Sequence, residues 1–446
     1  MPATLARVPN MRSATCALCA LLLLAPAPAT AGLTPAEQAM VRTVDAEQER
    51  TVEMLGRWVD QNSGSMNFAG VKAVGDMLRC ELEPLGFTVE WIDMRSANRA
   101  GHIVARQIPR GGKGGKKLLL IGHLDTVFEP DSPFQRWERN GNDGKGPGAG
   151  DDKGGMAVIV SALRAMKAAG TLNGADITVF LTGDEEDSGP VEISRRDLVA
   201  EGRRADVALD FEGLAQQDGL DMGSTARRSS NEWTLTVTAR SGHSSGIFTQ
   251  GSGSGAIYEA ARIIDTFRRE LPEDKLTFNV GLIGGGATAE LGADRIRIAA
   301  TGKTNIIAGT AIARGDLRAI SPEQVARAQA KMQAIVGQPL NGATAKIEFH
   351  ADGYPPMAPT EGNRALLARL NQVNADMGLA PMGELDPVRR GAGDISFVAK
   401  DVDGLVGLGA ASDGDHAPGE TVDIASIFRQ AKRAAILMSR LAAERR

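Results

Sequence analysis

Two of the five histidines in the sequence, His123 and His416, stand among carboxylates in a way that could bind a metal ion. His123 follows an apolar run, and Asp125 comes two positions later, on the same face of an extended chain. A metal-bound imidazole usually needs a carboxylate or carbonyl on its other nitrogen, and Asp125 could supply one. By itself a His-x-Asp pair is more often a turn or a surface pair, so neighbouring motifs must decide.

Two clusters of acids strengthen the interpretation as a metal site. Asp151 and Asp152 lie in the run GAGDDKGG, where one aspartate can cap the following helix and the glycines let the other approach a cation. Glu185 and Glu186 lie in the run TGDEEDSG, after an apolar stretch. A solvated acidic loop is the ordinary explanation, but adjacent carboxylates beside a buried sheet repel one another unless a cation neutralises them.

The remaining candidate ligands complete a set without sulfur. Asp210 and Glu212 lie in the run ALDFEG, and His416 lies in the run SDGDHAPGE. Cys80 is the one cysteine beyond residue 31, so a thiolate site cannot form. Imidazole and carboxylate ligands suit Zn²⁺, with Co²⁺ or Mn²⁺ as alternatives. The inventory is large enough for two ions that share one carboxylate.

The elements that must position these residues first alternate between strand and helix. Continuous apolar runs at 117–122, 176–181 and 207–209 predict strands buried on both faces of a parallel sheet. Helices are expected at 35–58, 71–85, 156–169 and 423–444. Strands expected at 232–239, 277–282, 310–318 and 345–349, with helices at 256–270 and 322–335, follow a β-α-β-β-α-β order.

This pattern predicts an α/β fold with a mixed, mainly parallel sheet flanked by helices, interrupted by a smaller α+β domain. We predict a catalytic domain in two parts, residues 32–226 and 354–446, and an inserted domain at 227–353. Ligands of open α/β sheets collect at the carboxyl ends of the strands, and most of the acidic and histidine clusters follow such ends.

The first 31 residues are predicted to be an export signal. Arg7 and Arg12 precede a short apolar core, and the small-x-small triplet ending at Ala31 fits signal cleavage. The protein is therefore expected to be periplasmic or secreted, without a membrane span after cleavage. The net charge of −5 argues against a nucleic-acid partner.

Five motifs together, LLLIGHLDTV, GAGDDKGG, TGDEE, ADVALDFEG and DGDHAPGE, resemble those of the dinuclear zinc peptidases. That family includes glutamate carboxypeptidase, aminoacylase and succinyl-diaminopimelate desuccinylase, and the glutamate-carboxypeptidase branch is the most similar. The resemblance implies two Zn²⁺ per subunit bridged by Asp151. It assigns the other positions as follows: His123 and Glu212 to one ion, Glu186 and His416 to the other, Glu185 as general base, and Asp125 as the residue that orients His123. Asp210 remains an alternative to Glu212.

The resemblance also implies substrate-binding residues and a partner. His243, in the run SGHSSG, would reach the active site of the second subunit of a homodimer, so the inserted domain would serve as dimerisation and lid domain. Asn305 and Arg318 match positions that bind the free carboxylate of the substrate, and Gly393 matches a glycine-rich substrate loop. The implied reaction is hydrolysis of a peptide or N-acyl amide that releases an amino acid, with glutamate favoured by the branch. His102 and His350 match no motif and are interpreted as structural.

Three other functions fit the sequence less well. The run Gly242-x-Ser244-x-Gly246 matches a serine-hydrolase nucleophile elbow, but an elbow needs a buried parallel strand before it and a helix directly after it. A non-catalytic metal-binding or peptide-binding protein is the second alternative, although it would have no use for Glu185 beside the metal. The glycines at 146, 148 and 150 form only a weak dinucleotide-binding motif.

Overall fold

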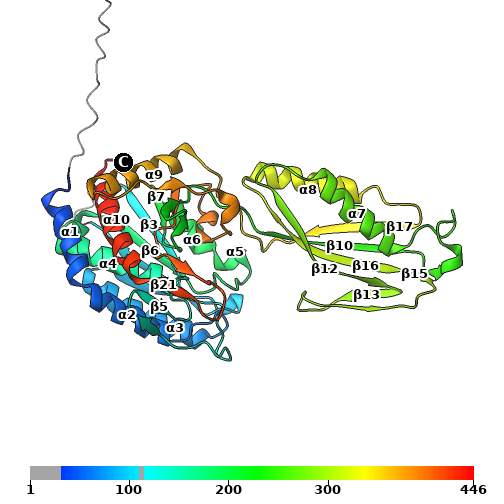
Figure 1. Ribbon diagram of the computed structural model, residues 1–446, viewed down its shortest axis with the longest axis horizontal. Helices are drawn as coiled ribbons and strands as arrows, with labels where there is room; N and C mark the ends of the chain where they lie inside the picture. Colours follow the sequence, from blue (N-terminus) through cyan, green and yellow to red (C-terminus); the bar gives the residue numbers. More distant parts are fainter. Residues whose placement is uncertain (1–31, 110–114) are drawn as a thin grey trace, which may run out of the picture.

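The computed structural model describes residues 32–109 and 115–446. The predicted export signal at 1–31 lies outside the described residues. Figure 1 shows two bodies joined by a narrow connection: a larger one built around a sheet covered by helices, and a slender one that carries β10 to β17. None of the helices in the described ranges combines the length and apolar character needed to cross a bilayer.

The larger body is organised by a six-stranded sheet with the order β1-β2-β6-β3-β7-β19. Strands β6, β3, β7 and β19 run parallel to one another. Strand β2 is antiparallel to β6, and the edge strand β1 is antiparallel to β2. The strands are β1 (Thr88–Asp93), β2 (Gly101–Gln107), β3 (Lys117–His123), β6 (Asp176–Thr182), β7 (Val207–Asp210) and β19 (Gly404–Val406). The prediction of a mixed, mainly parallel sheet is confirmed.

Alternate residues of the central strand β3 face two different cores, as period-two side-chain geometry requires. Leu118 and Leu120 join the core beneath the long helices, whereas Leu119 and Ile121 face a smaller cluster that includes Leu198. All four leucine and isoleucine side chains of this strand are buried. Because both faces are covered, the strand has the uninterrupted apolar sequence typical of parallel sheets.

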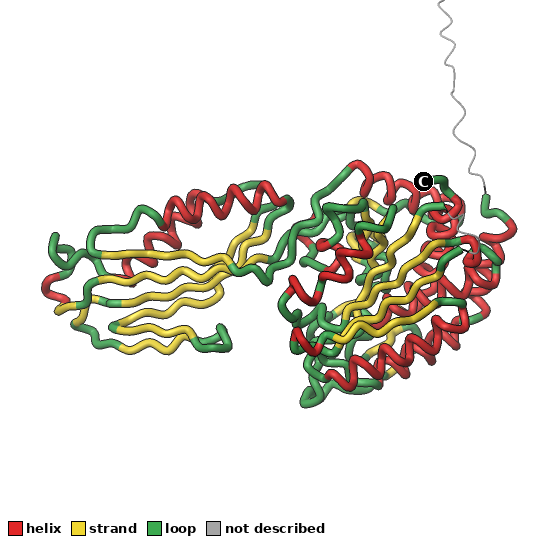
Figure 2. The backbone as a smooth tube through the Cα atoms, turned by 180° about the vertical axis from the view of Figure 1, so that it is seen from behind, coloured by secondary structure: helices red, strands yellow, loops and turns green. Residues whose placement is uncertain are grey.

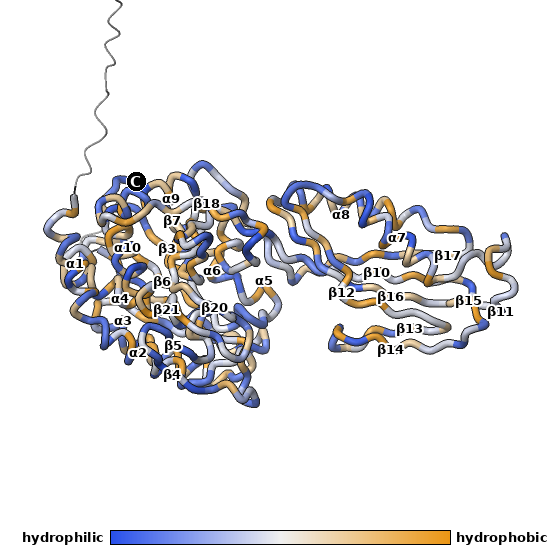
Figure 3. Tube along the Cα trace, viewed as in Figure 1, coloured by the Kyte–Doolittle hydropathy of each residue, from blue (hydrophilic) through white to orange (hydrophobic). Residues whose placement is uncertain are grey.

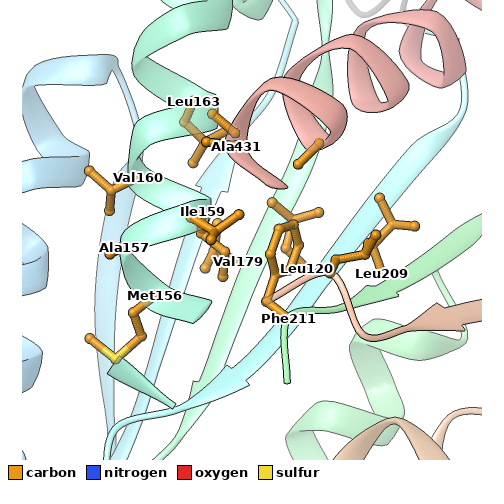
Figure 4. Packing of buried hydrophobic residues seen from close by; sticks show 14 of the residues in the cluster. Leu120, Met156, Ala157, Ile159, Val160, Leu163, Val179, Leu209, Phe211 and Ala431 are labelled. Atoms are coloured by element: carbon orange, nitrogen blue, oxygen red, sulfur yellow. The ribbon is translucent and has the colours of Figure 1, made fainter. Parts of the chain in front are cut away.

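Helices cover both faces of the sheet (Figure 2). Helix α4 (Lys153–Ala168) is buried along almost its whole length, between the sheet and helices α1, α2 and α10. Figure 4 shows Ile159 of α4 directed toward Val179 and Leu120 of the sheet, and Leu163 of α4 beside Ala431 of α10. The helices of this body are α1 (Pro35–Ala46), α2 (Gln48–Asp60), α3 (Phe68–Leu82), α4, α5 (Val191–Ser194), α6 (Arg196–Gly202), α9 (Glu361–Asp376) and α10 (Ile424–Ala443).

Two small sheets hold loops at the edge where the parallel strands end. The first has the order β20-β21-β5-β4 and joins the segment before Asp151 to the segment around His416. The second has the order β18-β9-β8 and precedes the loop at 389–393. Their strands are β4 (Glu138–Asn140), β5 (Asp143–Lys145), β20 (Ser412–Asp413), β21 (Thr421–Asp423), β8 (Ala215–Gln217), β9 (Leu220–Gly223) and β18 (Gly383–Glu384).

The slender body is an antiparallel sheet, β12-β16-β10-β17, with two helices packed against one face. In β10, Trp233, Leu235 and Val237 alternate into a separate apolar core shared with the helices. Its main elements are β10 (Asn231–Ala239), α7 (Ala256–Glu270), β12 (Thr277–Gly286), β16 (Thr310–Arg318), α8 (Pro322–Val336) and β17 (Ala343–Phe349). The pairs β11 (Gly242–His243) with β15 (Ile306–Ile307) and β13 (Thr288–Leu291) with β14 (Ile298–Thr301) complete it.

Several boundaries differ from the expected ones. The helix expected at 35–58 is two helices, since the helical ladder is interrupted at Glu47, the C-cap of α1. Strands β1 and β2 were not expected, and neither was the hairpin of β13 and β14. Apolar and polar residues alternate along the strands of the slender body, whereas apolar stretches cluster in the centre of the larger one (Figure 3).

The two bodies are connected by two chain crossings that pair with each other. Arg227 forms a backbone bridge with Met357, and Ser230 forms one with Tyr354. The amide nitrogens of Ser230 and Tyr354 each donate to the other residue's carbonyl oxygen, at 3.0 and 2.9 Å. The connection is therefore a two-stranded ribbon rather than two independent linkers.

Candidate metal and catalytic site

The predicted metal ligands converge where the parallel strands end. His123 is the last residue of β3, Glu185 and Glu186 follow β6, and Glu212 follows β7. Ligand atoms of His123, Asp151 and Glu186 lie within 4.8 Å of one another, as do those of His123, Glu185 and Glu212. His123 belongs to both groups, so the two groups share one edge of the sheet.

Asp151 lies between the two imidazoles that the sequence singled out. Its Oδ1 atom is 2.9 Å from His123 Nε2, and its Oδ2 atom is 3.2 Å from His416 Nε2. His416 Nε2 is also 3.1 Å from Glu186 Oε2. One carboxylate thus presents a different oxygen to each imidazole, which is the arrangement that a bridging ligand between two cations requires.

Titration of these groups reflects a dense cluster of buried acids. Burial raises the pKa of Glu186 to about 7, and burial together with repulsion from Glu212 raises the pKa of Glu185 well above its usual value. Hydrogen bonds to Asp151 and Glu186 raise the pKa of His416 to about 11. Burial opposes ionisation of Asp151, but hydrogen bonds from His123 and His416 hold its pKa far below the usual range.

The donor set fits a pair of divalent cations. Imidazoles and carboxylates supply every proposed ligand atom, and the one described cysteine, Cys80, is elsewhere on the surface. Among the described residues, the buried Oδ1 of Asp152 has no hydrogen-bond partner. Buried, unpartnered carboxylate oxygens are costly unless positive charge lies near them. Nitrogen and oxygen ligands without sulfur suit Zn²⁺ and also permit Co²⁺ or Mn²⁺.

Asp125 contacts His123, as expected, and also contacts the turn that carries Glu185 and Glu186. His123 Nδ1 lies 3.1 Å from the carbonyl oxygen of Asp125 and 3.4 Å from its carboxylate. The carboxylate accepts hydrogen bonds from the amides of Glu185 at 3.0 Å and Glu186 at 3.1 Å, and from the hydroxyl of Ser65 at 2.6 Å. Asp125 therefore fixes both the ring of His123 and the turn that carries the two glutamates.

The structure distinguishes the two acids that follow β7. Glu212 joins the cluster with His123 and Glu185, whereas Asp210 is in neither of the groups found among the described residues. Asp210 accepts a hydrogen bond from the amide of Glu212 at 3.3 Å and lies 3.5 Å from Arg227 Nη1. The same Arg227 atom lies 3.2 Å from Glu212 Oε2. The geometry favours Glu212 as the ligand, whereas Asp210 contacts the backbone of Glu212 and the side chain of Arg227.

Glu420 organises the loop that carries Asp151, a role that sequence analysis missed. Its buried carboxylate accepts hydrogen bonds from the amides of Gly148 at 3.0 Å, Gly150 at 2.8 Å and Asp151 at 3.0 Å. Burial raises the pKa of Glu420 to about 7, although these three amides oppose the rise. Its place in the run that contains His416 was the available signal.

A buried ionic network beneath the turn of Glu185 was also missed. Arg195 pairs with Asp184 at 2.5 Å and with Asp394 at 2.6 Å, and its Nη2 donates to the hydroxyl of Tyr354 at 2.9 Å. Tyr354 in turn donates to the backbone carbonyl of Glu185 at 2.9 Å. The network links the end of the slender body's return crossing to the candidate base.

Most of the residues expected to bind substrate lie away from the cluster of candidate metal ligands. His243 and Asn305 are exposed beside β11 and β15, at the end of the slender body away from the larger one (Figure 1). Arg318 pairs with Asp316 at 2.8 Å. Gly393 is buried, and a side chain there would overlap the guanidinium of Arg227. Within one chain, the first three of these residues do not reach the cluster of His123.

Ser244 lacks the setting of a nucleophile elbow. It follows the two-residue strand β11, which pairs antiparallel with β15, and begins a short 3₁₀ turn rather than a helix. His102 and His350 make structural contacts, as expected. His102 Nε2 is 2.9 Å from the carbonyl of Ser194, and His350 Nε2 is 2.9 Å from the hydroxyl of Thr234.

A cavity of about 480 Å³ opens onto the cluster. Asp151, Glu185, Glu212 and His416 line it, together with positively charged residues. The other lining residues are Gly213, Leu214, Ala215, Gln216, Arg227, Leu385, Arg389, Arg390, Gly391, Ala392, Ser412 and Asp415. The cavity can hold a small, charged organic molecule against the candidate metal ligands.

At one edge of the sheet, Asp151 lies between two imidazoles, and Glu185 lines the same cavity. This combination of residues is that of a metal-dependent hydrolase. A family model described as Peptidase family M20/M25/M40 matches residues 119–440. The chain belongs to this family, which confirms the prediction made from the five motifs.

Individual relatives agree with that assignment. Carboxypeptidase G2 of Pseudomonas sp. is 34% identical over 209 residues, covering 45% of this chain and 48% of that protein; the match thus spans about half the length of the relative. Aminopeptidase PepT of Bacillus cereus aligns with a TM-score of 0.70 at 19% identity, over 89% of this chain and 99% of that one. A dinuclear metal-binding M20 peptidase of Bacillus subtilis aligns with a TM-score of 0.61 at 14% identity, over 89% and 99%. At these identities the two solved structures establish the fold.

Proposed function

We propose that the protein is an exported, two-zinc hydrolase of the carboxypeptidase or aminoacylase type. Its reaction would cleave an amide bond and release a C-terminal or N-acylated amino acid, with glutamate the favoured residue. The observation that carries this proposal is the position of Asp151 between His123 and His416, with Glu185 lining the same cavity. Similarity to carboxypeptidase G2 supports an amide substrate that ends in a free carboxylate.

The proposed ligands are His123 and Glu212 for one cation, Glu186 and His416 for the other, and Asp151 for both. When bound, the two cations would acidify a water molecule and polarise the amide carbonyl. Glu185 would accept the proton from the attacking water and deliver it to the departing nitrogen, which is the ordinary work of a positioned carboxylate. Glu185 lines the cavity and its carboxylate lies close to His123 and Glu212, so it is placed to hold the proton between the two transfers.

A second copy of the chain is part of the proposal. His243 and Asn305 are exposed at the far end of the slender body, where a partner subunit's cavity could receive them. We propose that the active enzyme is a homodimer in which His243 contacts the substrate held by the other subunit. Export rests on the sequence of residues 1–31 alone.

The function is tested with a panel of N-acyl amino acids and dipeptides. The protein is treated with a chelator, assayed, and assayed again after addition of Zn²⁺, Co²⁺ or Mn²⁺. We expect no turnover after chelation, recovery with metal, and a strong preference for substrates with a free C-terminal carboxylate. Preference for blocked C-termini, or full activity in the chelated protein, would contradict the proposal. Inhibition by a serine-directed phosphonate but not by a chelator would instead favour Ser244.

A further inference from the structure

The wall of the active-site cavity carries three arginines that no part of the proposed mechanism uses: Arg227, Arg389 and Arg390. Arg227 helps to hold the site, although its Nη1 atom has no hydrogen-bond partner among the described residues. It pairs with Glu212, its Nε donates to the carbonyl of Gly391 at 2.8 Å, and its Nη2 donates to the carbonyl of Ala392. Arg227 therefore anchors the loop on which the other two arginines lie.

Arg390 is different because its charge is buried but weakly paired. Its side chain is 13% exposed, and the nearest carboxylate oxygen, Glu212 Oε2, is 3.8 Å from its Nη2. In the part of the chain that the structure describes, its Nε atom has no hydrogen-bond partner. Glu212 is already paired with Arg227 at 3.2 Å.

The position of Arg390 suits an anion attached to the scissile amide. Arg390 lines the same cavity as Glu185 and Glu212. In an amino acid released by hydrolysis, the α-carboxylate is separated from the scissile carbonyl carbon by only three covalent bonds, so it must lie close to the metal ligands. A planar guanidinium binds a carboxylate through two parallel hydrogen bonds. Arg318, the residue expected to do this, pairs with Asp316 and does not line the cavity.

We propose that Arg390 binds a carboxylate of the substrate and so makes the enzyme selective for anionic leaving amino acids. This inference rests on the proposed hydrolase function and adds the residue that selects the substrate. Arg227 acts as a positioning residue, since it holds the Gly391–Ala392 backbone next to Arg390. Arg389 lies on the same loop and is exposed.

The test compares three N-acyl substrates that differ in which carboxylates they carry: the derivative of glutamate, the derivative of glutamine, and the derivative of glutamate whose α-carboxylate is a primary amide. The acyl group is the one cleaved best in the panel above. Zinc-loaded wild type, Arg390→Gln and Arg390→Lys are assayed, with Arg268→Gln as control because Arg268 is a solvent-exposed arginine on α7. Bound zinc is measured in each protein.

We expect Arg390→Gln to retain both zinc ions and to lose about 10- to 100-fold in kcat/KM on substrates that keep the recognised carboxylate, mainly through KM. Loss on the glutamate and glutamine compounds, with the α-amide unaffected, assigns Arg390 to the α-carboxylate. Loss on the two compounds with a γ-carboxylate, with glutamine unaffected, assigns it to the side chain. Arg390→Lys should recover part of the loss, and Arg268→Gln should match the wild type.

Two outcomes overturn the inference while leaving the hydrolase function intact. One is an equal loss on all three substrates or a loss of bound zinc, which would mean that Arg390 only supports Glu212. The other is unchanged kinetics in Arg390→Gln. If zinc-loaded wild type cleaves no compound in the panel, the proposed function itself is wrong, and this result is visible before any variant is made.

Discussion

The hydroxyl of Tyr354 donates a hydrogen bond of 2.9 Å to the backbone carbonyl of Glu185 and accepts one from Arg195. Tyr354 belongs to the crossing that returns from the slender body, where it pairs with Ser230. The residue proposed as general base is therefore held in part by the connection between the two bodies.

Tyr354→Phe should lower kcat several-fold and change KM little, because it removes one hydrogen bond worth about 1 kcal/mol from the turn of Glu185. Steady-state kinetics and circular dichroism check this. The chain has one other tyrosine, Tyr258, which is 55% exposed on α7. Tyr258→Phe is the matched control and should behave as the wild type. Equal kinetics in both variants would show that the bond does not position Glu185.

Glu185→Ala should retain both zinc ions and lose roughly 10²- to 10⁴-fold in kcat, since it removes the proton acceptor but no proposed ligand. Kinetics and elemental analysis of the same preparation separate the two effects. Glu192→Ala, an exposed glutamate on α5, is the control. Full activity of Glu185→Ala would remove the mechanism, and loss of zinc would make Glu185 a ligand.

Glu420→Ala should weaken zinc binding about 10- to 100-fold, as is typical when a residue that orients a ligand is lost. The change leaves the amides of Gly148, Gly150 and Asp151 without their shared acceptor. Competition with a chromophoric chelator measures the affinity. Asp413→Ala, an exposed acid on β20, should leave it unchanged. Unchanged affinity in Glu420→Ala would show that the loop holds Asp151 without help.

Gly393→Ala should destabilise the protein by about 1 to 3 kcal/mol, the usual cost of overpacking, since the added methyl group overlaps the guanidinium of Arg227. At Gly391, two residues earlier, an added methyl group meets no atom within 4 Å. Gly391→Ala should therefore unfold at the wild-type urea concentration. Equal unfolding midpoints for the two variants would contradict the tight fit at Gly393.

His102 should make the fold sensitive to acid. Burial lowers the pKa of His102, whose Nδ1 accepts a hydrogen bond from the amide of Gly183 at 3.1 Å. Its folded pKa lies below its unfolded value, so between those two values the unfolded chain binds more protons. Stability is therefore lost as the pH falls below the unfolded pKa, by at most about 1.4 kcal/mol per pH unit.

His102→Asn should be less stable than wild type at pH 7 but should lose less stability between about pH 6.5 and pH 5, the region below the unfolded pKa of histidine. Urea unfolding of the chelated protein at several pH values measures the slope. His350→Asn, a change at a half-buried site, is the comparison. An unchanged slope in His102→Asn would show that other groups carry the acid sensitivity.

Sequence patterns revealed β3, β6 and β7 and the long antiparallel strands of the slender body, but missed β2 and the short strands. Residues 117–122 are buried on both faces, so the strand appears as an uninterrupted apolar run. Strand β1 at the sheet edge is largely exposed, and strands such as β20 have two residues. The short strands are stabilised by contacts with the surrounding structure, and the local sequence does not reveal such contacts.

The same contrast holds in the site. The candidate ligands were detectable because each follows a strand or lies in an unusual acidic run. Arg195 was not, because it stands beside the exposed Arg196 in a polar stretch, and its partners Asp394 and Tyr354 are distant in sequence. Arg390 became notable only when the fold placed it in the cavity.

The mutual pairing of Ser230 and Tyr354 has an engineering consequence. Residues paired across an antiparallel ladder lie about 5 Å apart, so a tight turn could join the chain on one side of this bridge directly to the other. Such a shortened polypeptide would keep all five proposed metal ligands, Glu185 and Arg390, and would lack His243 and Asn305. A shortened protein of this kind would be a minimal version of the enzyme. The contribution of the removed segment to turnover could then be measured by adding that segment back as a separate molecule.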